Sequence, residues 1–282
     1  MNYRHAFHAG NFADVMKHAL LVRMIAYLQR KDAPLRVVDT HAGLGLYDLT
    51  GDEAGRTGAW HDGVGRLGEP FAPEVEALLA PYRQVIDAIQ ARHGAEVYPG
   101  SPAIVRELLR RQDRGVFVEL HPADHAVLAD RFNAVTNTKV MHLDGWTALH
   151  ALIPPREKRG LVLIDPPYEE PNELARLGSE LVRAARKWPT GLYAGWYPVK
   201  DVRAVNAVAA ALHRDSPRPG LRLEIYVDDP SDATRLNGCG LFVLNPPWTL
   251  RDEAEILLPA LAERLSRRGY GAYRCEAFGP AP

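Results

Sequence analysis

Short apolar runs that alternate with segments of helical periodicity constrain the fold of this chain most strongly. The runs predict strands at 35–39, 115–119, 138–143, 160–164, 191–196, 221–227 and 240–244. Helices are predicted at 102–113, 122–134, 171–187, 200–213 and 252–268, and apolar positions at helical spacing also fill residues 15–28. Ser101 is expected to cap the helix that follows it, with Pro102 at its first position. This alternation is typical of an α/β fold with a Rossmann-like, mostly parallel sheet between helices.

The spacing of the first two strands predicts an insertion. The first strand ends near Asp39 and the second begins near Gly115, whereas a complete strand-helix-strand unit needs only about 30 residues. We therefore expect a core of residues 1–45 and 101–282, with its N-terminal segment over the site, and a small helical insertion at 46–100. Helical patterns at 74–79 and 82–89 support this division. A lid, a substrate-binding module and a passive decoration all remain compatible with it.

Composition limits the class of protein. A chain of 282 residues with 46% hydrophobic residues can bury a sizeable core. No apolar stretch approaches the roughly 18 residues of a membrane span and no signal peptide is evident, so we expect a cytoplasmic protein without membrane partners. The cysteines, Cys239 and Cys275, lie in no CxxC pattern, so neither a metal site nor a disulfide is predicted.

Charge is distributed unevenly along the chain. The net charge of −1 argues against a surface that binds polyanions everywhere. Residues 1–31, however, contain five lysines and arginines, with Asp14 as their only acidic residue. The N-terminal segment can therefore form a local basic patch.

The segment Asp165-Pro166-Pro167-Tyr168 follows the apolar run 161–164. An amine on a heteroaromatic ring spreads its lone pair into the ring, so a methyl acceptor of this kind must be drawn toward tetrahedral geometry by hydrogen-bond acceptors. The Asp165 carboxylate and the Pro166 carbonyl are candidate acceptors, and Tyr168 is a candidate platform for an extruded base. The pattern favours methylation of a base nitrogen. The alternative is a strand followed by a rigid proline turn.

Other strand ends predict a site for a nucleotide-like methyl donor. The strand at 35–39 leads into a loop that contains His41 and Gly43, where the backbone can approach a ligand closely. Glu119 ends the next strand at the position where an acid commonly holds a ribose diol. Asp144 and Gly145 follow the third strand and are suited to the amino group of an adenine ring. Because carboxyl ends of parallel strands meet at one edge, these residues are expected to line one crevice.

A second segment, Asn245-Pro246-Pro247-Trp248, repeats the pattern of an apolar run followed by two prolines and an aromatic residue. It is predicted to end the last strand, where a turn at a sheet edge is sufficient reason for prolines. The first segment ends the fourth strand, next to the strand at 35–39. Strand order therefore favours Asp165 over Asn245 as the functional residue.

Taken together, these features resemble class I S-adenosylmethionine-dependent methyltransferases of the adenine-N6 type. Residues 3–18, 39–43, 100–102 and 165–169 are similar to motifs of the RlmJ family of 23S ribosomal RNA adenine-N6 methyltransferases, and the similarity covers nearly the whole chain. The resemblance implies a seven-stranded sheet with its last strand antiparallel, a helical insertion and no metal. It also implies a monomer that methylates N6 of one adenine of 23S rRNA, the family site being adenine 2030. A DNA adenine-N6 methyltransferase and a non-catalytic nucleotide- or RNA-binding module are the alternatives.

The resemblance also assigns roles to individual residues. The resemblance assigns catalysis to Asp165 and a substrate contact to Tyr3; the residue pattern adds Pro166 and Tyr168 beside Asp165, and the basic segment adds Arg4 on the substrate side. The resemblance assigns cofactor contacts to His18, His41, Ser101, Glu119, Asp144, Gly145 and Asp165, with Lys17 beside them, and the glycine loop after the first strand adds Gly43. Plainer roles are a helix cap for Ser101 and a packed imidazole for His18.

Overall fold

The computed structural model describes residues 4–232 and 234–281. Its strands are β1 (Arg36–Asp39), β2 (Leu46–Asp48), β3 (Val97–Pro99), β4 (Arg114–Glu119), β5 (Thr138–His142), β6 (Gly160–Ile164), β7 (Leu192–Val199), β8 (Gly220–Tyr226), β9 (Gly238–Leu244) and β10 (Ala272–Phe278). Its α-helices are α1 (Phe12–Leu28), α2 (Asp52–Thr57), α3 (Pro73–His93), α4 (Ser101–Leu108), α5 (Pro122–Phe132), α6 (Gly145–Ala151), α7 (Glu173–Lys187), α8 (Val202–Asp215) and α9 (Leu250–Arg264). Short 3-10 helices lie at His5–Phe7, Ala59–Asp62 and Val64–Leu67.

One large sheet organises the molecule, with strand order β10-β8-β9-β7-β6-β1-β4-β5. The run from β5 to β7 is parallel, whereas β9 lies antiparallel between β7 and β8. Strand β10 pairs antiparallel with β8 at the edge of the sheet. The expected α/β sheet is confirmed, but it has eight strands and not seven.

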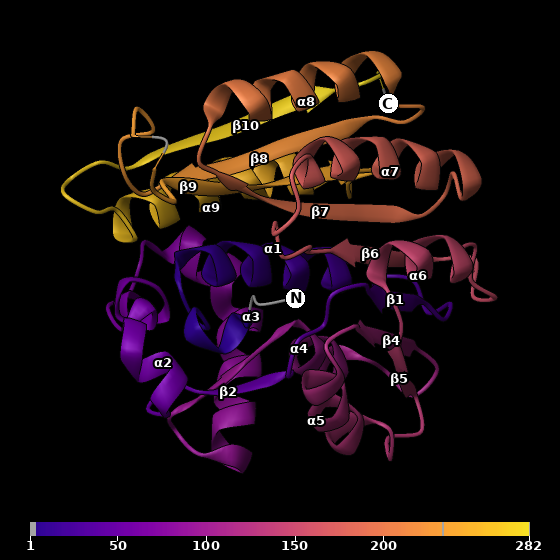
Figure 1. The fold of residues 1–282 in the computed structure, drawn as a ribbon, viewed down its shortest axis with the longest axis horizontal. Helices are drawn as coiled ribbons and strands as arrows, with labels where there is room; N and C mark the ends of the chain where they lie inside the picture. Colours follow the sequence, from indigo (N-terminus) through magenta and orange to yellow (C-terminus); the bar gives the residue numbers. More distant parts are fainter. Residues whose placement is uncertain (1–3, 233, 282) are drawn as a thin grey trace.

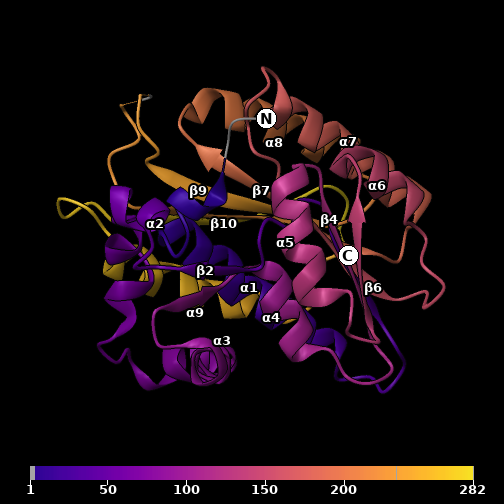
Figure 2. The ribbon, with the colours of Figure 1, turned by 60° about the horizontal axis from the view of Figure 1, so that its bottom comes forward.

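The sheet lies between two helical layers, as Figure 2 shows. Helices α1, α4, α5 and α9 pack on one face around a core that contains Leu161 and Leu163. Helices α6, α7 and α8 cover the other face, to which Val162 and Ile164 contribute. Neighbouring residues of β6 therefore point to opposite faces, and both faces are buried. A strand buried on both sides reads as a continuous apolar run, which explains why β6 was evident in the sequence.

Residues 46–100 form the short ribbon β2-β3, helix α2, two 3-10 turns and the long helix α3. Their core is shared with the rest of the molecule, because Leu79 and Tyr82 of α3 belong to the same apolar cluster as Leu20 of α1. In Figure 1 this indigo-to-purple region lies below the C-terminal strands, on the side of α1. The boundaries of the proposed insertion remain a prediction.

Two local expectations were wrong. Helix α4 is capped by Gly100 in an extended conformation, and Ser101 is already its first residue. The Ser101 hydroxyl is directed instead to a buried carboxylate of β1. Strand β9, which precedes Asn245, was expected at a sheet edge but lies between β7 and β8. A turn at an edge therefore does not explain the prolines at 246 and 247.

Candidate active site

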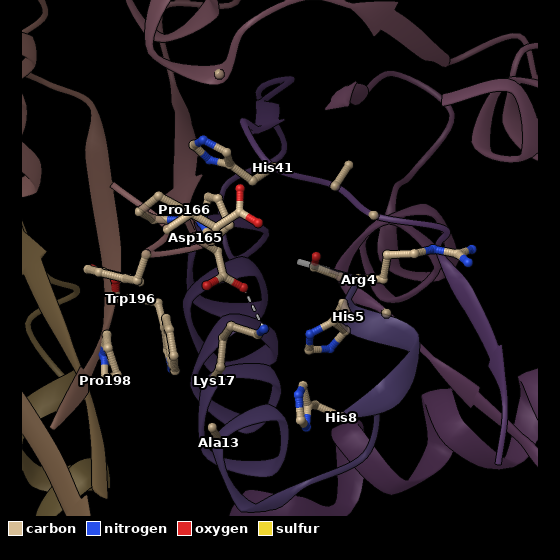
Figure 3. A pocket seen from close by; sticks show the side chains of 18 of the residues that line it. Arg4, His5, His8, Ala13, Lys17, His41, Asp165, Pro166, Trp196 and Pro198 are labelled. Atoms are coloured by element: carbon tan, nitrogen blue, oxygen red, sulfur yellow. Dashed lines mark hydrogen bonds and ion pairs between the residues drawn. The ribbon is translucent and has the colours of Figure 1, made fainter. Parts of the chain in front are cut away.

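A cavity of about 920 Å³ opens at the carboxyl ends of β1, β4 and β6. The predicted site residues that the structure describes all line it: Arg4, Lys17, His18, His41, Gly43, Ser101, Glu119, Asp144, Gly145, Asp165, Pro166 and Tyr168. Tyr3 lies outside the described residues. Figure 3 shows Asp165 above Lys17, with Trp196 on one side and Arg4 and His5 of the N-terminal segment on the other.

A buried charge cluster positions the Asp165 carboxylate. The Lys17 ammonium donates to Oδ2 of Asp165 at 2.6 Å and lies 2.9 Å from Oδ1 of Asp14. Burial opposes the charged form of Lys17, but the two carboxylates hold its pKa well above the ordinary value. Burial likewise opposes ionisation of Asp14, yet His5 and Lys17 hold the pKa of Asp14 well below the ordinary value. Lys17 and Asp14 are therefore both charged, and Lys17 fixes one oxygen of Asp165.

The start of α1 arranges this cluster. The Asn11 side chain caps α1 by accepting hydrogen bonds from the amides of Ala13 and Asp14. Oδ2 of Asp14 lies 2.8 Å from Nε2 of His5 and accepts from the amide of Gly10 at 2.9 Å. Asp14 thus ties the first turns of the chain to the helix that carries Lys17. Sequence reasoning missed this role, although an acid three residues before Lys17 in a basic segment was a usable signal.

Arg4 lies at the cavity mouth between two acids. Its guanidinium is 2.5 Å from Glu53 of α2 and 3.5 Å from Asp124 of α5. The predicted substrate-side arginine therefore links the N-terminal segment to elements on two sides of the cavity. The expectation that the N-terminal segment covers the site remains a prediction.

Gly43 and Glu119 form one wall. The Gly43 amide donates to Oε2 of Glu119 at 2.8 Å, and the amide of His121 donates to Oε1 at 2.7 Å. Burial raises the pKa of Glu119. Gly43 adopts a φ of +62°, and a Cβ there would come within 2.3 Å of the Tyr47 hydroxyl. The loop after β1 thus depends on glycine, and each carboxylate oxygen of Glu119 keeps capacity for a ligand hydroxyl.

Asp144 and Gly145 form a second wall at the start of α6. The Asp144 side chain caps this helix by accepting from the amide of Thr147. A Cβ at Gly145 would lie 2.4 Å from the Thr40 carbonyl oxygen and 2.5 Å from Nε2 of His41, so only glycine allows this approach. Burial lowers the pKa of His41 to about 4, and its ring therefore faces the cavity as a neutral imidazole.

His18 and Ser101 lie deeper than the other predicted residues. Nδ1 of His18 is 2.8 Å from the Tyr98 hydroxyl, and burial lowers the pKa of His18 to about 3. The Ser101 hydroxyl donates to Oδ2 of Asp39 at 2.6 Å, and burial raises the pKa of Asp39 to about 7. Both side chains have protein partners, so the structure gives each a packing role beside its predicted ligand role.

Tyr168 is fixed by strand β7. It adopts a φ of +55°, its hydroxyl donates to the Trp196 carbonyl at 2.6 Å, and the two rings meet edge to face at 5.7 Å. Lys17 Nζ lies 5.9 Å from the Trp196 ring centroid. Trp196 was not among the predicted residues, because a tryptophan in a buried strand carries no signal that separates packing from ligand contact.

S-adenosylmethionine fits the donors and spaces that these residues provide. Because Gly43 has no side chain, a ligand can approach the backbone of this loop closely. Glu119 provides carboxylate oxygens on the same wall, and Asp144 and Gly145 form a second polar wall. Among residues 4–232 and 234–281, no cluster of His, Cys, Asp and Glu is arranged to hold a metal ion. In the same part of the chain, no helix is long and apolar enough to cross a membrane.

The fold and the cavity define a Rossmann-like α/β protein of the methyltransferase class. A model of the family described as "Ribosomal RNA large subunit methyltransferase D, RlmJ" matches residues 32–277. The chain belongs to this family of ribosomal RNA large subunit methyltransferases.

Individual relatives agree with this assignment. The chain is 36% identical to Ribosomal RNA large subunit methyltransferase J of Haemophilus influenzae over 282 residues, with 99% of each chain covered. It is 37% identical to the protein of the same name from Escherichia coli K12 over 271 residues, with 96% of each covered. A crystal structure of protein LPL1258 from Legionella pneumophila superposes with a TM-score of 0.83 at 35% identity, covering 96% of this chain and 98% of that one.

Proposed function

We propose that this chain transfers a methyl group from S-adenosylmethionine to N6 of one adenine in 23S ribosomal RNA. The observation that carries the proposal is the position of Asp165, which leaves β6 beside β1 and faces the same cavity as Gly43, Glu119 and Asp144. The Asp165 carboxylate, which would accept the amine, and the residues that would hold a cofactor thus line the same cavity. From family membership we propose adenine 2030 as the target, a monomeric enzyme, and action in the cytoplasm, where ribosomal RNA is located.

Asp165 orients the amine of the target base. Lys17 engages Oδ2, and Oδ1 is available to accept a hydrogen bond from that amine. A carboxylate held in one orientation needs no reorganisation when positive charge develops on the nitrogen, which is how preorganised groups lower barriers. Because the Lys17 ammonium donates to Oδ2, the carboxylate is held as an acceptor and an electrostatic partner and need not be a strong base.

The residues around Asp165 complete the proposed site. The Pro166 carbonyl is the second acceptor for the amine, and the Tyr168 ring, fixed against Trp196, is the platform for the extruded base. Lys17, His41, Ser101, Glu119 and Gly145, together with the other predicted cofactor residues, would hold S-adenosylmethionine. When bound, the cofactor supplies an electrophilic methyl group on its sulfonium. Arg4 and Tyr3 are proposed to contact the RNA.

A labelled-methyl assay tests the proposal. The purified protein should label deproteinised 23S rRNA, and nuclease digestion should release the label as N6-methyladenosine. Duplex DNA should remain unlabelled, and Asp165→Ala is the control for a contaminating activity. Labelled DNA would identify a DNA adenine methyltransferase, and RNA binding without transfer would identify a non-catalytic module.

Cofactor binding is tested separately from transfer. S-adenosylmethionine should raise the melting temperature without RNA, since a ligand at a hundred times its Kd stabilises the native state by about 2.7 kcal/mol. Glu119→Ala should reduce this shift. A shift with NAD and none with S-adenosylmethionine would contradict the proposed cofactor.

A further inference from the structure

A second hollow, of about 550 Å³, lies beside the cavity and is lined by four arginines: Arg66, Arg235, Arg267 and Arg268. We refer to it as the arginine hollow. Leu236 lines both the arginine hollow and the cavity, so the two spaces adjoin. Two aspartates, Asp62 and Asp228, also line the hollow. On a chain of net charge −1, this local excess of guanidinium groups does not follow from composition.

Three distant segments build the arginine hollow: the 3-10 turns at 59–67, the loop between β8 and β9, and the loop between α9 and β10. Ala272 at the start of β10 pairs with Tyr226 at the end of β8, so both loops lie at one edge of the sheet. This is the edge at which the parallel strands end and the cavity opens. Figure 1 shows both loops on the left, above the purple turns.

Backbone contacts hold these segments together. A guanidinium nitrogen of Arg66 donates to the Ser266 carbonyl, and Arg264 donates to the carbonyls of Glu69 and Pro70 at 2.6 and 3.1 Å. The turns at 59–67 are thereby fixed against α9 and the α9–β10 loop, and the Arg267 amide donates to the Val227 carbonyl, which joins that loop to the β8–β9 loop. The positive charges from the separate segments are therefore brought together by the fold itself, before any ligand binds.

The guanidinium groups of the arginine hollow still have hydrogen-bond donors available for an anion. Arg235 and Arg268 have side chains 57% and 63% exposed, and each is paired with a neighbouring acid, Asp232 at 3.6 Å and Asp228 respectively. Exposed ion pairs contribute little stability. A guanidinium also has five donors in a planar fork that matches a phosphate, so one carboxylate partner leaves several donors available.

We propose that the arginine hollow binds phosphates of the RNA strand next to the target base. This inference rests on the proposed function, because it assigns a path to the RNA of that reaction. A base that enters the cavity leaves its backbone at the mouth, and the strand must continue over a neighbouring surface. The arginine hollow shares Leu236 with the cavity and offers the charge that the backbone requires.

The test is RNA binding across a salt series by the double variant Arg235→Gln/Arg268→Gln. The matched control is Arg183→Gln/Arg214→Gln, which removes two arginines of 69% and 70% exposure that also lie beside acids, Glu180 and Asp215, on α7 and α8. Each phosphate contact with single-stranded RNA contributes about −0.7 to the slope of log K against log salt. The double variant should therefore flatten the slope by about 1.4 and weaken binding at low salt, while the control keeps the wild-type slope.

Asp62→Asn provides a change in the opposite direction. Asp62 accepts from Arg66 and lies 3.5 Å from Nε of Arg267, so its neutralisation should tighten RNA binding. All variants should keep the wild-type melting temperature shift with S-adenosylmethionine. If the wild type neither binds nor methylates RNA, the proposed function fails. If the wild type methylates RNA but the double variant and the control have equal slopes, the arginine hollow is not the RNA path and this inference alone is overturned.

Discussion

The ends of β6 and β9 carry nearly the same sequence but lie in opposite places. After β6, Asp165 faces the cavity and is bound by Lys17. After β9, the Asn245 side chain donates to the backbone carbonyls of Pro189 and Gly191 at 2.8 and 2.7 Å, and Trp248 is 74% exposed. Strand β9 runs antiparallel to β7, so Asn245 lies at the opposite edge of the sheet. Strand direction, more than the motif, decides which pair of prolines borders a site.

Of the substitutions at the ends of β6 and β9, those of Asp165 should reduce methyl transfer the most. Asp165→Ala should abolish transfer because the amine loses its acceptor, and Asp165→Asn should be nearly as inactive because an amide offers no anionic oxygen. The measurement is single-turnover methyl transfer, with folding checked by circular dichroism. A folded variant that retains more than about a tenth of wild-type turnover, a loss below about 1.4 kcal/mol, contradicts the assigned role.

A charged partner, Lys17, binds Asp165 after β6, whereas the Asn245 side chain after β9 binds backbone carbonyls. Lys17→Met should lower the free energy of unfolding by about 3–5 kcal/mol, because it removes the ammonium group beside the buried Asp14 carboxylate, and it should also reduce methyl transfer. Denaturant unfolding and the methyl assay measure the two effects. Arg23→Met is the matched control on α1: it breaks the ion pair with Glu253 and should cost stability but not specific activity. Equal activity of both folded variants would remove Lys17 from the site.

Acidification should lower the free energy of unfolding through the buried histidine His18, which lies beside the cavity. His18 has a folded-state pKa of about 3 against an ordinary 6.5, so the unfolded chain binds a proton that the folded chain excludes. Its contribution is complete above pH 6.5 and declines on acidification, by about 2.7 kcal/mol at pH 4.5. The measurement is the free energy of unfolding of the wild type minus that of His18→Gln, and this difference should decrease as the pH is lowered from 6.5 to 4.5. The exposed His93→Gln is the control, and a parallel pH dependence for wild type and His18→Gln would refute the account.

Asn245 should affect stability alone. Asn245→Ala removes two hydrogen bonds and places alanine at a φ of +52°, so it should destabilise the fold by about 2 kcal/mol with turnover intact. Asn245→Gly tolerates this φ and isolates the hydrogen bonds, and Trp248→Ala, at an exposed position, should change stability by less than about 0.5 kcal/mol. Thermal unfolding and the methyl assay provide the data. An inactive but folded Asn245 variant would move the assigned site to β9.

The sequence was most informative where burial and chemistry coincide. The strands of the parallel core are apolar runs, and the polar residues that end them line one cavity, so fold class and candidate residues were both predictable. Strand β10 was missed because it lies at the sheet edge with Tyr273 and Glu276 exposed, which gives no apolar run. Strands β2 and β3 are three residues each, too short for a pattern.

Partnerships between distant residues were not predictable. The sequence places Lys17 and Asp165 148 residues apart, and only the packing of α1 against the sheet brings them to 2.6 Å. Asp14 seemed a single acid in a basic segment, but the fold buries it between His5 and Lys17. A hydrogen-bond partner depends on three-dimensional position, and no local spacing contains that information.

The reversal of β9 and β10 also determines how freely this scaffold can acquire new specificity. The reversal of β9 places the whole β8–β9 hairpin loop, 227–237, at the cavity edge, and the reversal of β10 brings the α9–β10 connection, 265–271, to the same edge. Such loops can change in length and composition while the strands keep their register, because surface loops tolerate insertion. Under the proposed function, the residues for methyl transfer lie on the parallel strands and the proposed RNA path lies on these loops, so the two can change in sequence independently.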